Sequence, residues 1–211
     1  LVETEPLADG VWLLGGGSHN SVAVEFQDHI AVIEAPLNEE RSLAVIEEVA
    51  RLAPTKPIRF IVTTHHHWDH VGGLRTYVHD GATVITHERN RAYYQEILRA
   101  RPWLLEPDRF SLHPPEEWSE GYIFETVGEK YILGDENRTV ELHHVQDLNH
   151  VSGMLIAYFP QEKLVVEADL YTPPPGDRPP PIPSASSRTF YENLQRLNLD
   201  VETIVPIHGR P

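Results

Sequence analysis

A dense cluster of histidine and aspartate occupies residues 65–70, within the stretch TTHHHWDHVGG. His65 and His67 are two positions apart, so a loop that leaves a strand can direct both imidazoles to the same side. Two neutral imidazoles are typical ligands of a divalent cation such as zinc. Asp69 and His70 follow one turn later and can reach a second cation. The spacing therefore predicts metal binding rather than a solvated, histidine-rich turn.

The composition limits which groups can bind a metal. The 211 residues include 13 histidines and no cysteine, so imidazole and carboxylate ligands remain while thiolates and disulfides are excluded. The formal net charge is −15 without a visible cluster of Lys and Arg, so we expect no nucleic-acid partner. No apolar run approaches the roughly 18 residues of a membrane-spanning helix, so we expect no membrane partner.

Segments of strand and helix character alternate along the chain and must position the cluster. Short runs rich in Val, Ile and aromatic residues predict strands, and apolar residues at helical spacing predict helices. We expect strands at 10–14, 21–26, 30–35, 58–64, 82–87, 121–126, 130–133, 138–145, 153–159, 163–168 and 202–207. We expect helices from the N-cap Asn38 to Ala53, and at 72–78, 88–100 and 190–199.

The order of these elements predicts a layered α/β sandwich with helices outside. Strands precede helices in each half of the chain, and no break in composition marks a second domain, so we expect one domain over residues 1–211. The apolar run 58–64 predicts a buried strand that leads directly into the histidine cluster. Residues 101–118 and the Pro-rich segment 171–186 are expected at the surface, the latter as a rim of the site, a connector or an oligomer contact.

The stretch THHHWDHVGG resembles the signature of the metallo-β-lactamase superfamily. Later segments match the remaining motifs of that family in order: LNHVSGMLIAYF supplies His150, LVVEADLY supplies Asp169 and TIVPIHGRP supplies His208. The resemblance covers nearly the whole chain. It implies a four-layer αβ/βα sandwich, in which two mixed β-sheets are flanked by helices and metals bind at one edge between the sheets.

The resemblance also implies a set of ligands for two zinc ions, with iron or manganese as alternative metals. The first ion would be held by His65, His67 and His150. The second would be held by Asp69, His70 and His208, and Asp169 would bridge the two.

The other histidines have no partner at a ligand spacing, and we interpret them as surface or core residues. These are His19, His29, His79, His87, His113, His143 and His144. His66 lies between two candidate ligands and is expected to point away from the metals. Trp68 is interpreted as a packing residue beneath the site.

The implied chemistry is hydrolysis of a small-molecule substrate. A hydroxide held between two cations would attack an ester-like, thioester, lactone or lactam carbonyl. Asp69, beyond its role as a ligand, would orient that hydroxide or pass a proton to the leaving group. Tyr171 is a candidate donor to an oxyanion, with packing at the pocket rim as the alternative interpretation.

The resemblance leaves several subclasses open. The best-known β-lactamases of the family carry a cysteine where this chain has Asp169, which favours other branches without excluding β-lactam cleavage. The motif is similar to that of glyoxalase II, a thioesterase with a further C-terminal helical domain for glutathione. This sequence ends three residues after His208, so we expect it to lack that specificity.

Functions other than hydrolysis are also represented in the superfamily. A persulfide dioxygenase would bind a single iron through two histidines and the later aspartate, but the complete second set of ligands weighs against it. Nucleic-acid processing is disfavoured by the net charge of −15. A non-catalytic metal-binding domain is the remaining alternative. The sequence specifies neither an oligomeric state nor a cellular compartment.

Overall fold

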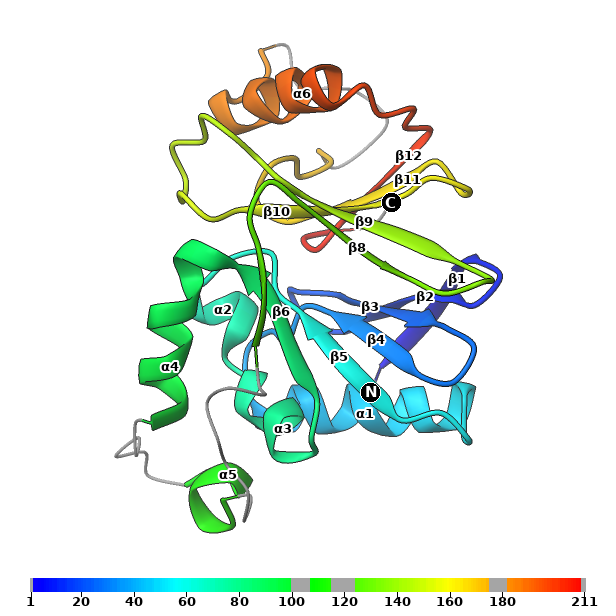
Figure 1. Ribbon diagram of the computed structural model, residues 1–211, viewed down its shortest axis with the longest axis vertical. Coiled ribbons are helices and arrows are strands. Elements are labelled where there is room, and N and C mark those ends of the chain that lie inside the picture. Colours follow the sequence, from blue (N-terminus) through cyan, green and yellow to red (C-terminus); the bar gives the residue numbers. More distant parts are fainter. Residues whose placement is uncertain (1, 100–106, 115–123, 175–181, 210–211) are drawn as a thin grey trace.

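The computed structural model describes residues 2–99, 107–114, 124–174 and 182–209 (Figure 1). Two β-sheets lie face to face, and helices cover their outer faces. This arrangement confirms the predicted fold class, an α/β sandwich of two mixed sheets flanked by helices.

The first sheet contains seven strands in the order β1-β2-β3-β4-β5-β6-β7. The strands from β1 to β4 pair antiparallel, and those from β4 to β7 pair parallel. Their bounds are β1 Glu3–Ala8, β2 Val11–Gly15, β3 Ser21–Glu25, β4 Ile30–Ile33, β5 Ile58–Val62, β6 Thr83–His87 and β7 Phe124–Val127.

The second sheet contains five strands in the order β12-β11-β10-β9-β8. β11 and β12 pair parallel, and the other neighbours pair antiparallel. Their bounds are β8 Lys130–Gly134, β9 Thr139–His144, β10 Leu155–Phe159, β11 Leu164–Glu167 and β12 Thr203–Pro206.

The helices begin at well-defined caps. Asn38 accepts a hydrogen bond from the Arg41 N–H at the start of the first helix, as the sequence predicts. Ser184 accepts one from the Ser187 N–H in the same way at the last helix. The helices are α1 Glu39–Leu52, α2 Trp68–Val71, α3 Leu74–His79, the 3₁₀ turn η1 Glu88–Asn90, α4 Arg91–Arg99, α5 Arg109–Leu112 and α6 Ala185–Leu197.

Three apolar clusters hold the layers together. One lies between the two sheets and includes Val24, Leu142 and Val166. A second joins the first sheet to α1, α3 and α4, and a third joins the second sheet to α6. Burial of apolar area stabilises such layers by roughly 25 cal/mol per Å². Among the described residues, no helix is both long and apolar enough to cross a lipid bilayer.

The structure corrects several expected boundaries. β1 was not predicted, because ETEPLA has few apolar residues. It is an edge strand that pairs with β2 alone. The helix expected at 88–100 consists of η1 followed by α4, and α6 begins within the segment expected to be a Pro-rich loop. α5 lies within the expected surface excursion 101–118, of which 101–106 and 115–118 fall outside the described residues. Residues 121–123 of one expected strand also fall outside them.

Candidate metal centre

The predicted ligands gather at one edge of the sandwich, where parallel strands end. β5 ends shortly before His65 and His67, β11 ends before Asp169, and β12 ends before His208. His150 lies in the loop between β9 and β10. The carboxyl ends of parallel strands meet at one edge of a sheet, which is where open α/β folds place their binding sites.

A first group of donor atoms comes from His65, His67, His150 and Asp169, all within 4.8 Å of one another. The Asp169 Oδ2 atom lies 3.0 Å from His150 Nε2 and 3.2 Å from His65 Nε2. His65 is fully buried, and its Nε2 makes no well-aligned hydrogen bond within the part of the chain that the structure describes, although Asp169 Oδ2 lies 3.2 Å away. A buried imidazole nitrogen that faces a carboxylate and two more imidazoles fits a cation ligand.

A second group comes from Asp69, His70, His208 and His19, again with donor atoms within 4.8 Å of one another. His208 Nε2 lies 3.3 Å from His70 Nε2, and His19 Nε2 lies 3.3 Å from Asp69 Oδ2. The sequence alone did not indicate this position of His19, which was interpreted as a surface or core residue. The only sequence feature that points to His19 is a weak one, the polar SHN turn before an apolar strand.

Asp169 stands between the two groups. Its Oδ1 atom lies 2.8 Å from His208 Nε2, and its Oδ2 atom lies 3.2 Å from His70 Nε2 as well as near the first group. The residue has a φ of +60°, a left-handed conformation that Asp tolerates better than most residues. Glu167 holds this turn by accepting hydrogen bonds from the N–H groups of Leu170 and Tyr171.

A buried carboxylate orients His70. Glu34, at the end of β4, has Oε2 2.6 Å from His70 Nδ1, and its Oε1 accepts the Thr64 N–H at 2.7 Å. His70 Nε2 is therefore the nitrogen that faces the second group. Carboxylates commonly fix metal-binding histidines in this way. Glu34 was not among the predicted site residues, although an acidic residue in the apolar segment IAVIEA was a usable signal.

Burial disfavours a second proton on several of the histidines. Burial lowers the pKa of His65, His67 and His19, and neighbouring histidines lower each of these pKa values further. The neutral imidazole is the form that binds a cation. These three rings are therefore held in the form that a ligand requires.

The pKa values of His70 and Asp169 are both shifted in the direction that favours the charged form of the side chain. Burial opposes the protonation of His70, but Glu34 and Asp169 raise its pKa to about 10. Burial also opposes the ionisation of Asp169, yet hydrogen bonds from the surrounding histidines, His208 first, hold its pKa below the ordinary value. The site thus attracts positive charge, which a divalent cation would supply in place of the extra proton.

Comparison with known proteins identifies the family. The sequence model of the metallo-beta-lactamase superfamily matches residues 14–208, which include all seven predicted ligands. The chain belongs to the metallo-beta-lactamase superfamily.

The chain is also similar in sequence to a curated protein. The 2,4-dinitroanisole O-demethylase subunit alpha of Nocardioides sp. (strain JS1661) is 24% identical over 207 residues, covering 97% of this chain and 57% of the relative. This chain therefore spans little more than half of that protein's length.

Two solved structures show the same fold at low identity. A metallo-beta-lactamase from Pontibacter korlensis has a TM-score of 0.73 and 16% identity, over 99% of this chain and 92% of that one. Rubredoxin oxygen:oxidoreductase from Desulfovibrio gigas has a TM-score of 0.69 and 16% identity, over 99% and 57% of the respective chains.

The two glycines of the superfamily motif permit a close approach. A Cβ atom on Gly72 would lie 2.1 Å from the Leu37 carbonyl oxygen, and one on Gly73 would lie 2.0 Å from Ser42 Oγ. The Leu37 N–H donates to the Asp69 carbonyl at 3.0 Å across this contact. The glycines also separate α2 from α3, so the helix expected at 72–78 spans Leu74–His79, and the turn of α2 was not predicted.

Other residues of the motif lie outside both groups. His66 points away as predicted, with Nδ1 3.2 Å from Asn90 Oδ1. The interpretation of Trp68 as a packing residue is wrong: it is 67% exposed, because the single turn of α2 buries His70 and Val71 while its first residue faces solvent.

Tyr171 packs against the apolar cluster beneath α6, and its role as an oxyanion donor stays a prediction.

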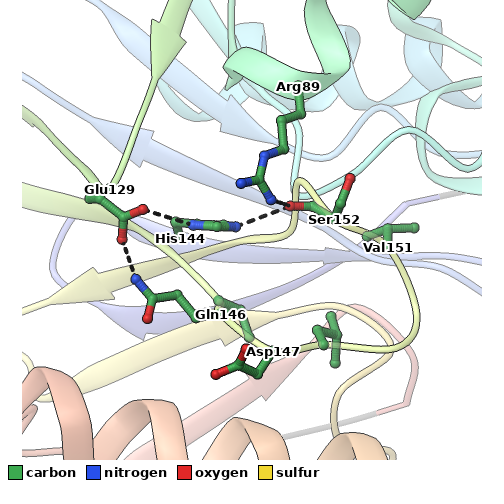
Figure 2. A pocket seen from close by; sticks show the side chains of 9 residues that line it. Arg89, Glu129, His144, Gln146, Asp147, Val151 and Ser152 are labelled. Atoms are coloured by element: carbon green, nitrogen blue, oxygen red, sulfur yellow. Dashed lines mark hydrogen bonds and ion pairs between the residues drawn. The ribbon is translucent and has the colours of Figure 1, made fainter.

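The loop that carries His150 also lines a pocket of about 340 Å³. Figure 2 shows Arg89 and His144 converging on the Ser152 carbonyl oxygen, at 2.9 Å from Arg89 Nη1 and 3.1 Å from His144 Nε2. Glu129 Oε1 lies 3.3 Å from the other ring nitrogen of His144. These contacts tie the loop to η1 on one side and to β9 on the other.

Proposed function

We propose that the protein is a dinuclear, zinc-dependent hydrolase that cleaves an ester-like, thioester, lactone or lactam bond of a small molecule. The observation that carries the proposal is the position of Asp169, whose two oxygens contact imidazoles from both groups. A carboxylate shared between two sets of histidines is the arrangement that a pair of cations requires.

The donor set fits such cations. His65, His67 and His150 would hold one, Asp69, His70 and His208 would hold the other, and Asp169 would contact both. Nitrogen and carboxylate donors suit zinc, with iron and manganese as alternatives. When bound, two divalent cations supply a Lewis acid for the substrate and lower the pKa of water from about 15.7 to about 7.

Asp69 would transfer the proton during hydrolysis. The side chain of Asp69 is 35% exposed, and its Oδ2 faces His19 and His70. It is therefore placed both to hold a cation and to take a proton from water and pass it to the leaving group. Burial of Glu34 and His70 keeps the second group fixed while this transfer takes place.

The net charge of −15 supports a small-molecule substrate rather than a nucleic acid. One relative is named a 2,4-dinitroanisole O-demethylase. We therefore include a nitro-substituted aryl methyl ether in the substrate panel, together with β-lactams.

An oxidative reaction is the second candidate, because nitrogen and carboxylate donors also suit iron and one structural neighbour is an oxidoreductase. A mononuclear iron dioxygenase acting on persulfides would use one group and leave the other without a role. Metal content and oxygen consumption separate the two candidates.

The test measures metal content and hydrolysis on the same sample. Zinc-loaded protein is expected to contain two ions per chain and to hydrolyse at least one class in a panel of esters, thioesters, lactones, lactams and aryl ethers. Asp169→Asn should abolish turnover, whereas His66→Ala should retain it. One iron per chain with oxygen uptake would favour oxidation, and an inactive protein with two metals would favour a non-catalytic domain.

A further inference from the structure

His19 occupies a position that the superfamily motif does not explain. It lies in the turn between β2 and β3, far in sequence from the motif, yet its ring centroid is 4.1 Å from that of His208 and 5.0 Å from that of His70. It is only 6% exposed. A buried histidine among other imidazoles needs either a cation or a hydrogen-bond network to offset its desolvation.

The two nitrogens of His19 are used differently. Nδ1 lies 2.7 Å from Ser18 Oγ, and Nε2 lies 3.3 Å from Asp69 Oδ2, facing the second group. Two candidate ligands are oriented in the same way. His70 Nδ1 contacts Glu34, and His65 Nδ1 lies 3.0 Å from Thr64 Oγ1. In each ring the outer nitrogen is held and the inner nitrogen is left to point at the site.

The turn that carries His19 is fixed to the loop that carries His208. The Asn20 N–H donates to the Ile207 carbonyl at 2.9 Å. Its side-chain Nδ2 donates to the Pro206 carbonyl at 3.2 Å and the Gly209 carbonyl at 2.7 Å. Two segments nearly 190 residues apart are thereby locked together, and the two imidazoles approach the second group as one unit.

We propose that His19 is a further ligand of the second metal, beside Asp69, His70 and His208. This inference rests on the proposed dinuclear function. Each group then has three imidazoles, with Asp169 shared, and the second group has Asp69 in addition. Because the second site has one more donor than the first, we expect it to bind its cation more tightly and to fill first.

Titration of the metal-free protein, residues 1–211, with Zn²⁺ against a chromophoric chelator tests the assignment. The wild type should bind two equivalents, the tighter one at the second site. His19→Ala should weaken that equivalent at least about tenfold and leave the other within about threefold. His66→Ala is the matched control, since this neighbouring histidine contacts Asn90, and both equivalents should be unchanged. Added free imidazole should restore part of the loss in His19→Ala.

A second measurement gives its main result on the wild type. In the Co²⁺-substituted wild type, the paramagnetically shifted ring N–H signals count the coordinated histidines. We expect six signals, including His19, and the loss of one in His19→Asn. Five signals in the wild type, or unchanged metal affinities in His19→Ala, would overturn the assignment. A wild type that binds fewer than two metals would instead overturn the dinuclear function itself.

Discussion

Glu34 and His70 form a buried carboxylate–imidazole pair, with 2.6 Å between Oε2 and Nδ1 and both side chains inaccessible to solvent. The pair fixes which nitrogen of His70 faces the second group. Glu34 directly follows β4 and has a left-handed conformation, with a φ of +74°. From this position Glu34 contacts both His70 and the Thr64 N–H.

Substitution of Glu34 should therefore act on metal binding. In Glu34→Gln, the amide N–H₂ faces His70 Nδ1, so the neutral ring carries its proton on the nitrogen that must bind the metal. We expect the affinity of the second site to fall about 10- to 100-fold, as for other partners of metal-binding histidines. Competition with a chelator measures the change. Equal affinities in Glu34→Gln and the wild type would show that the pair does not orient His70.

The contact between Gly72 and Leu37 predicts a loss of stability. Gly72→Ala places a Cβ atom 2.1 Å from a backbone oxygen, so the segment after β4 must move. We expect the free energy of unfolding to fall by at least about 1–3 kcal/mol. Urea denaturation measures it. Gly128→Ala is the control, because a Cβ atom there meets nothing within 4 Å, and its effect should stay within about 0.5 kcal/mol.

Asn90 should stabilise the loop that carries His150. Its Nδ2 donates to the Gly153 carbonyl at 2.8 Å, and the side chain is buried. Asn90→Ala leaves that carbonyl without its partner, which costs about 1–3 kcal/mol. Thermal denaturation should show a lower midpoint, and the affinity of the first metal site should fall. Arg89→Ala removes an exposed contact with the same loop and should have a smaller effect; an equal effect would contradict this account.

His87 predicts a loss of stability in acid. Burial first, and then the neighbouring His144, lower the pKa of His87 to about 4. The unfolded chain, with a pKa of about 6.5, binds the proton more readily, so stability is full above pH 6.5 and is lost as the pH falls toward 4. The whole contribution is on the order of 3 kcal/mol.

The measurement is the free energy of unfolding between pH 7 and 4. His87→Gln retains an acceptor for the Arg89 N–H but does not titrate, and should flatten the dependence on pH. His79→Gln is a control at a more exposed histidine and should leave the slope as in the wild type. An equally steep loss in His87→Gln would assign the acid sensitivity to other groups.

The sequence indicates which side chains gather at the sheet edge better than it indicates what surrounds them. His65, His67, Asp69 and His70 lie in one short loop after an apolar strand, so their convergence follows from local spacing. His150, Asp169 and His208 could be named only by resemblance, and the structure brings each of them to the same edge.

The residues that were missed depend on tertiary contacts. His19 joins the second group only because Asn20 ties its turn to the loop after β12. Glu34 meets His70 across two neighbouring parallel strands. Trp68 was interpreted as a packing residue beneath the site, but the exposure of a residue in a one-turn helix depends on what covers that turn. The edge strand β1 has no apolar alternation that would identify it.

The central claim is that two cations are bound with Asp169 between them. A crystal structure of the zinc-loaded protein, with anomalous scattering measured at the zinc edge, tests it most directly. Two peaks are predicted, one among His65, His67 and His150 and one among Asp69, His70 and His208, each in contact with Asp169. A single peak, or two peaks with Asp169 bound to neither, would contradict the account.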